Sequence, residues 1–166
     1  MPILSFEDLY GGKICAALAR QHPRDLFDVK LLFENEGITD KLRQAFIIYL
    51  ASSPRPIHEL LNPHPALQEL RQAYEEDFVG MTKHTVLYED LMQVRLDLIS
   101  QLLKSFTNNE RLFLLSLKSG MPDWDLMPIP GIENLPGLKW KLMNIEKMDQ
   151  AKHKIALEKL KQVLSL

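Results

Sequence analysis

The chain has 166 residues, of which 46% are hydrophobic and 25% charged, and its formal net charge at pH 7 is -2. This composition excludes an intrinsically disordered chain, and the single cysteine excludes an internal disulfide framework and a cysteine-rich zinc site. The near-neutral charge of the whole molecule predicts no nucleic-acid or membrane partner, and no apolar run is long enough to span a bilayer. The N-terminus has no signal-peptide pattern, so we expect a cytoplasmic protein.

The balance of residue types predicts an all-α fold. Leucine occurs 30 times and isoleucine 11 times, against 5 valines and 4 threonines. Leucine favours helices, whereas β-branched residues favour strands, and no hairpin signal or sustained alternation is present. We expect a compact multi-helix bundle that forms a single domain over residues 1–166. Its parts are a helical core at 5–120, a proline-rich meander at 121–137 and C-terminal helices at 138–166.

The first third of the chain predicts three helices, over residues 6–21, 24–36 and 39–52. Ser5 and Thr39 have side-chain oxygens that can cap the first and third of these helices. Pro23 ends the first helix, because the residue before a proline avoids the α conformation. Gly37 ends the second helix as a C-terminal cap.

The rest of the chain predicts a short turn at 57–61 and helices over 66–79, 86–106 and 107–120. The 86–106 segment has the widest apolar stripe, so we expect it to be the central core helix. Thr107 and Glu110 have the spacing of a capping box at the start of the next helix. The last helical region, 138–166, is expected to break near Asp149.

Charged side chains of both signs gather around the first predicted helix–helix connection. Lys13 and Arg20 are two helical turns apart and share a face. If the second helix folds back, Arg24, Asp25 and Asp28 come close to the same end. Cations beside carboxylates suit a phosphate or nucleoside-triphosphate site. The alternative is ordinary helix chemistry, in which Arg24 and Asp28 pair on a solvated face and Asp25 favours a helix N-terminus.

Two adjacent glycines, Gly11 and Gly12, stand inside the first predicted helix. Each costs about 1 kcal/mol relative to alanine in a helix interior. Close packing of another helix, or close approach of a ligand to the backbone, would offset this cost.

The segment from Glu7 to Arg20, followed by Arg24 to Val29, resembles the AbiEii/AbiGii toxin family of nucleotidyltransferases. The helical motifs of that family read Lys-x-x-Ala with a downstream Arg, followed by Arg/Lys-Asp-x-x-Asp. The matching positions are Lys13, Ala16, Arg20, Arg24, Asp25 and Asp28. A looser resemblance continues over residues 113–117, 122–124 and 135–141.

The resemblance implies the helical lobe of a polymerase-β-like nucleotidyltransferase, the toxin of a type IV toxin–antitoxin or abortive-infection pair. It implies that Asp25 and Lys13 are catalytic, and that Lys13, Arg20, Arg24 and Asp28 bind the nucleotide. For the full-length enzyme it implies Mg²⁺ and a nucleoside triphosphate. It also implies tRNA as an acceptor, because related members modify tRNA, and an antitoxin as partner.

The chain departs from the family pattern in one respect that bears on catalysis. The family carries a Gly-Ser loop and a metal-binding Asp-x-Asp on a sheet before these helices, whereas Lys13 here follows Met1 by only twelve positions. We therefore expect a C-terminal helical part that holds no metal or cofactor alone and does not catalyse alone, since phosphoryl transfer depends on metal ions. Asp123 and Asp125 form another Asp-x-Asp, but the surrounding prolines favour a turn.

Two further interpretations remain open at the level of sequence. The chain is alternatively a non-catalytic interaction module that docks an antitoxin or a separate catalytic domain, which predicts an exposed apolar patch. Residues 139–166 also contain seven lysines against three acids, whereas residues 67–90 contain six acids against two cations. The lysine-rich end is either a solvated helix face or a contact for RNA phosphates.

Overall fold

The computed structural model describes residues 5–166, and within that range it contains helices and no strand, which confirms the all-α class. The α-helices are α1 (Phe6–Arg20), α2 (Pro23–Asn35), α3 (Asp40–Ser52), α4 (Ile57–Leu61), α5 (Leu67–Ala73), α6 (Tyr88–Ser105), α7 (Asn108–Ser119), α8 (Pro136–Glu146) and α9 (Gln150–Leu164). A π-helical turn, η1 (Tyr74–Phe78), continues α5. Two 3-10 turns, η2 (Trp124–Leu126) and η3 (Ile132–Asn134), lie in the proline-rich connection before α8.

The predicted helix caps form as expected from their side chains. The Ser5 hydroxyl accepts from the Asp8 amide at 3.1 Å, and the Thr39 hydroxyl accepts from the Leu42 amide at 3.2 Å. Thr107 and Glu110 form a reciprocal capping box at the start of α7. These contacts satisfy amides that have no partner inside the helix, so local sequence determines where these helices begin.

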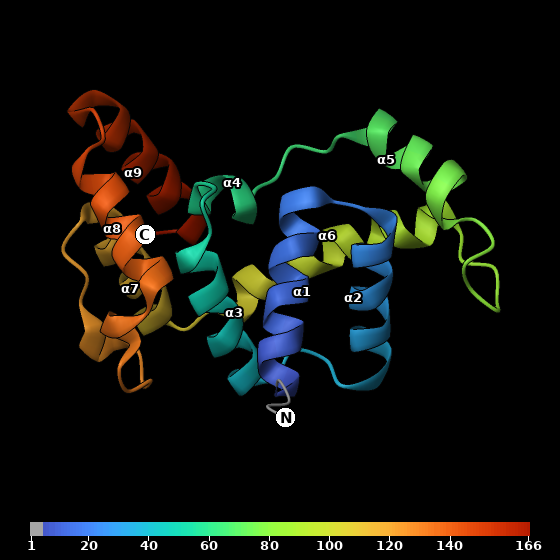
Figure 1. The fold of residues 1–166 in the computed structure, drawn as a ribbon, viewed down its shortest axis with the longest axis horizontal. Coiled ribbons are helices and arrows are strands. Elements are labelled where there is room, and N and C mark those ends of the chain that lie inside the picture. The colour runs from blue at the N-terminus through green and yellow to red at the C-terminus, as the bar shows by residue number, and fades with distance from the viewer. Residues whose placement is uncertain (1–4) are drawn as a thin grey trace.

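The centre of the fold is α3, and not the 86–106 segment that the sequence analysis placed there. Helix α3 packs against α1, α4, α7 and α8, whereas the main partner of α6 is α2. Figure 1 shows α3 between α1 and the group formed by α7, α8 and α9. The prediction was wrong because an apolar stripe does not show how many neighbours a helix has. Leu96 on α6 and Leu87 just before it are more than half exposed.

One cluster of buried apolar side chains extends from Ile14 on α1 to Leu164 on α9. Phe46 and Phe113, on α3 and α7, are among its largest fully buried members. A buried ion pair accompanies this cluster, since the Arg43 Nε donates to both carboxylate oxygens of Glu110 at 3.0 and 2.9 Å. This pair connects α3 to α7.

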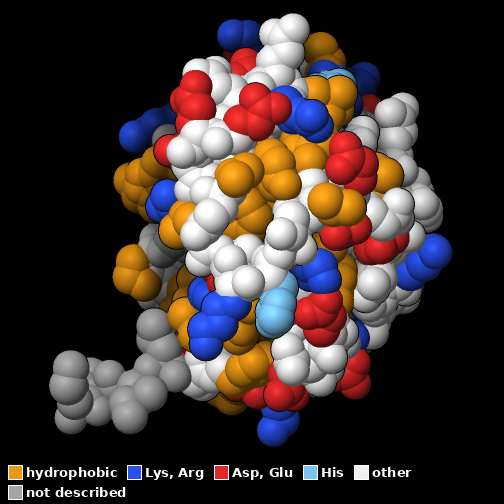
Figure 2. Space-filling model, turned by 90° about the vertical axis from the view of Figure 1, so that its right-hand side faces the viewer, with side chains coloured by type: hydrophobic (Ala, Val, Ile, Leu, Met, Phe, Trp, Pro, Cys, Tyr) orange, Lys and Arg blue, Asp and Glu red, His pale blue; other side chains and the backbone are white. Residues whose placement is uncertain are grey.

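A lateral extension, formed by α5, η1 and the loop 79–87, lies at the right of Figure 1. Figure 2 views the molecule from that side and shows hydrophobic side chains gathered among charged ones. The exposed large hydrophobic side chains of this extension include Leu67, Val79 and Met81. None of the helices in residues 5–166 has both the length and the apolar character that crossing a bilayer requires.

Candidate functional site

The predicted site residues lie along the hairpin formed by α1 and α2. Gln21 ends α1 in the left-handed conformation, with φ 52°, and His22 caps α2 by accepting from the Arg24 amide at 3.2 Å. Pro23 occupies the first turn of α2, where its missing amide hydrogen costs nothing. The chain therefore reverses within two residues, and α1 and α2 lie side by side (Figure 1).

Four of the five predicted charged residues form two ion pairs across this hairpin. The Lys13 ammonium lies 3.0 Å from the Asp28 carboxylate, and both side chains are about one-third exposed. The Arg20 guanidinium binds Asp25 in fork geometry, with Nε and Nη2 at 3.1 and 2.8 Å from the two carboxylate oxygens. The predicted fold-back therefore brings Lys13 and Arg20 together with the two acids.

Arg24 departs from this arrangement. Its guanidinium donates to the backbone carbonyl of Asp77 on η1 at 3.3 Å, and the neighbouring His22 ring lies 3.7 Å from the Asp77 carboxylate. The N-terminal end of α2 therefore contacts the lateral extension. The sequence motif does not predict this contact. The five residues consequently form two ion pairs and one separate contact.

The carboxylates of the hairpin do not fit a magnesium site. Both oxygens of Asp25 accept hydrogen bonds from Arg20, and Asp28 is neutralised by Lys13. Mg²⁺ requires near-octahedral oxygen ligands and keeps several waters, which carboxylates held by cations do not offer. Among the residues that the structure describes, no group of three or more His, Cys, Asp or Glu side chains is placed to hold a metal ion.

The Asp-x-Asp at residues 123–125 forms a turn, as predicted. Asp123 caps η2, and its carboxylate accepts from the Asp125 amide at 3.3 Å. The Asp123 amide in turn donates to the Ser116 hydroxyl at 3.0 Å.

A buried polar network around Gln21, at the end of α1, was not predicted from the sequence. The buried Arg95 guanidinium donates from Nε to the Gln21 side chain at 2.6 Å and from Nη2 to the Pro63 carbonyl at 2.7 Å. The Gln21 amide nitrogen donates to the His64 carbonyl at 2.8 Å. Burial lowers the pKa of Arg95. Gln21 and Pro63 lie 74 and 32 positions before Arg95, and Gln21 and His64 are 43 positions apart. No local motif in the sequence could therefore reveal the network.

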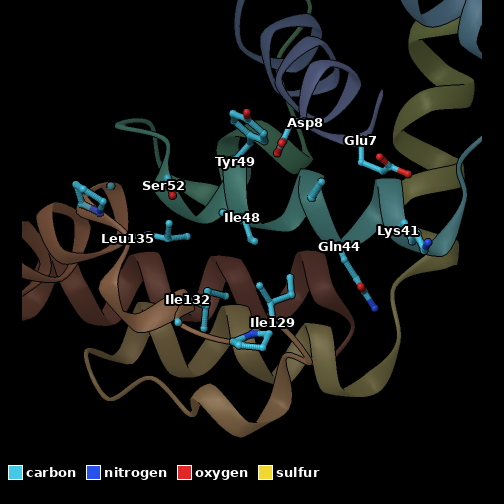
Figure 3. A pocket seen from close by; sticks show the side chains of 15 residues that line it. Glu7, Asp8, Lys41, Gln44, Ile48, Tyr49, Ser52, Ile129, Ile132 and Leu135 are labelled. Carbon is cyan, nitrogen blue, oxygen red and sulfur yellow. The ribbon is translucent and has the colours of Figure 1, made fainter. Parts of the chain in front are cut away.

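A cavity of about 640 Å³ lies between α3 and the proline-rich connection, beside the start of α1 (Figure 3). Its walls are mainly apolar, with Ile48 on α3 facing Ile129 and Ile132 across the space. Glu7 and Lys41 stand at one end. None of the five predicted charged residues lines this cavity, and its residues come from segments too distant in sequence to form a motif.

Comparison with known proteins gives one match. The family described as nucleotidyl transferase AbiEii toxin of type IV toxin–antitoxin systems matches residues 1–125, which is about three-quarters of the chain. No curated protein and no solved structure matches the chain. The matched range includes the α1–α2 hairpin and ends at η2, before α8 and α9. The chain belongs to the AbiEii family of nucleotidyltransferase toxins.

Proposed function

We propose that this chain is the helical C-terminal portion of an AbiEii-type nucleotidyltransferase toxin and contributes side chains that contact the nucleotide phosphates. In this proposal Lys13, Arg20 and Arg24 supply positive charge. Asp25 lies at the reaction centre with Lys13, and Asp28 positions the lysine ammonium. The observation that carries the proposal is the placement of two cation–carboxylate pairs along one hairpin in a member of this family.

The ion pairs are compatible with a role in binding phosphate. Lys13 and Asp28 are each about one-third exposed, and the Arg20 side chain is 66% exposed. The Lys13–Asp28 pair, which is this accessible, is worth at most about 1 kcal/mol. A triphosphate presents a much larger negative charge than one carboxylate, so it can compete for Lys13 and Arg20.

Metal ions must come from elsewhere under this proposal, because Asp25 and Asp28 are held by cations. We propose that the complete enzyme uses Mg²⁺ and a nucleoside triphosphate, transfers to tRNA, and is controlled by an antitoxin in the cytoplasm during abortive infection. The chain described here would not catalyse the transfer by itself. Its own contribution would be to hold and orient the phosphates.

Titration calorimetry tests whether the hairpin binds nucleotides. The chain is titrated separately with ATP, GTP, CTP and UTP in the presence of MgCl₂. We expect saturable binding of at least one of them, weakened roughly tenfold or more in Lys13→Ala, because a hydrogen bond to a charged group contributes about 1.5–3 kcal/mol. The control is Lys30→Ala, which removes a lysine of α2 that pairs with Glu34. Equal affinities for the two variants would contradict the assignment.

The second candidate is a non-catalytic interaction module that docks an antitoxin or a separate catalytic domain. The apolar cavity in Figure 3 favours it, together with Phe6 and Leu9 at the start of α1, which are 38% and 44% exposed. The same titration separates the candidates, since a docking module binds none of the four nucleotides.

A further inference from the structure

A second cavity, of about 380 Å³, lies between α4 with its flanking turns and the C-terminal half of α9. Its lining is mainly polar and consists of Arg55, His58, Glu59, Asn62, His64, Lys159, Gln162 and Val163. Half of these residues are Arg, Lys or His, and Glu59 is the one acid among them. Because the whole chain carries a net charge of -2, this local excess of basic groups is not a general property of the protein.

Two buried lysines add positive charge near this cavity. Lys118 on α7 is 5% exposed, and its ammonium lies 3.7 Å from the Met148 sulfur, which is a weak acceptor. Lys141 on α8 is 6% exposed and donates to the carbonyls of Ser53 and Arg55 at 2.6 and 2.8 Å. Within residues 5–166, neither lysine has a carboxylate within ion-pair distance.

The charges of Lys118 and Lys141 act on His58 in the cavity lining. Burial lowers the pKa of His58, the charge of Glu59 opposes this, and the charges of Lys159, Lys118 and Lys141 add smaller lowering effects. Three ammonium groups are therefore close enough to His58 to disfavour its protonated form. Glu59 partly balances them; it is about half exposed, and its carboxylate lies 3.9 Å from Arg55.

The cavity is held in position by contacts to the rest of the fold. The Arg55 guanidinium donates to the Ala19 carbonyl at the end of α1, and the His64 carbonyl accepts from Gln21. These contacts fix both ends of the α4 segment against the α1–α2 turn. The basic side chains of the lining therefore stand on a preorganised support, which reduces the entropy lost on binding.

We propose that this cavity binds a phosphate group carried by a nucleotide or by a polynucleotide. Guanidinium, ammonium and imidazole groups, with the amides of Asn62 and Gln162, offer many hydrogen-bond donors to the oxygens of a phosphate. An anion would also offset the mutual repulsion of the cations around the cavity. The site is separate from the Lys13–Asp28 and Arg20–Asp25 pairs and does not depend on the nucleotidyltransferase role proposed for them.

Lys159 is the residue best suited to a test. It lies on the exposed side of α9, so replacing it leaves the core intact. Lys154 provides a matched control, because it is an exposed lysine of the same helix and is not part of the cavity lining. The variants Lys159→Gln and Lys154→Gln therefore remove the same charge from the same element.

Titration calorimetry at low ionic strength with inorganic phosphate, AMP and a single-stranded RNA oligomer tests the site. We expect saturable binding of at least one probe, weakened about threefold to fivefold in Lys159→Gln and unchanged in Lys154→Gln. Binding of AMP and phosphate identifies a nucleotide as the source of the phosphate, and binding of RNA alone identifies a polynucleotide. The proposal is overturned if none of the probes binds, or if the two α9 variants lose the same affinity.

Discussion

At the scale of single residues, Lys141 shows how tertiary burial changes a side chain that the sequence places in a lysine-rich tail. Lys141 is a buried residue of α8, and its ammonium donates to two backbone carbonyls of the connection between α3 and α4. Burial, together with the charge of Lys118 and against an opposing effect of Cys15, lowers the pKa of Lys141 from 10.5 to about 8. Lys161 and Lys139, in contrast, are bonded to Glu158 and Asn134 at the surface.

The depressed pKa of Lys141 predicts a specific pH dependence of stability. Between pH 8 and 10.5 the unfolded chain holds a proton on this lysine that the folded chain has lost, so wild-type stability gains up to about 3 kcal/mol across this window. Below about pH 8 the contribution is constant, because both states are protonated. Urea unfolding across this range should show the gain in the wild type and in Lys139→Met, and no such gain in Lys141→Met. The same slope in all three proteins would disprove the shift.

The motif residues show what spacing predicts at this scale. The partnership of Lys13 with Asp28 follows from two helices that reverse at a proline, and the structure contains it. The position of Arg24 does not follow, because its partner is a carbonyl on η1, 53 residues later. The spacing of residues within a hairpin predicts contacts inside that hairpin. It does not predict contacts to helices that follow much later in the sequence.

At the scale of elements, α1 and α3 pack closely against each other at Gly11. A Cβ atom on Gly11 would lie 3.1 Å from the Tyr49 ring and 3.2 Å from backbone atoms of Ala45 and Phe46. A Cβ atom on Gly12 would lie 3.6 Å from the Tyr49 ring, which is an ordinary contact. The need for glycine at position 11 therefore comes from helix packing, which was one of the two explanations that the sequence left open.

The two glycines predict opposite effects of the same substitution. Gly11→Ala forces the α3 backbone to move and should destabilise the protein by about 1–3 kcal/mol, a typical cost of overpacking. Gly12→Ala gains helix propensity without a clash and should stabilise it by up to about 1 kcal/mol. Thermal and urea unfolding of the two variants measures both changes. Destabilisation of similar size at both positions would show that packing against α3 is not the cause.

At the scale of the whole molecule, the Arg43–Glu110 pair joins the N-terminal helices to the C-terminal group. The Glu110 side chain is 4% exposed and also accepts from the Thr107 amide, so it caps α7 and binds α3 at once. Arg43 has a second partner in Asp40, whose side chain is 84% exposed. Arg43 therefore has one buried acidic partner, Glu110, and one exposed acidic partner, Asp40.

This arrangement predicts unequal effects of removing the two acids. Glu110→Gln leaves a buried guanidinium without its main counter-charge and should cost about 3–5 kcal/mol. Asp40→Asn removes a solvated partner of the same arginine and should cost less than about 1 kcal/mol. Urea unfolding free energies of the two variants give the comparison. A loss at Asp40 that equals the loss at Glu110 would contradict the structure.

The sequence by itself determined the helical class, most helix boundaries, the caps at Ser5, Thr39 and Thr107, and the family. These features depend on interactions between residues within a few positions of each other, so they can be deduced from local pattern. Only the tertiary structure decided that α3 is central, that Arg24 contacts η1, and that the cavities beside α3 and α9 form. The lining of each cavity is assembled from segments tens of residues apart, and such long-range packing leaves no periodic signal along the chain.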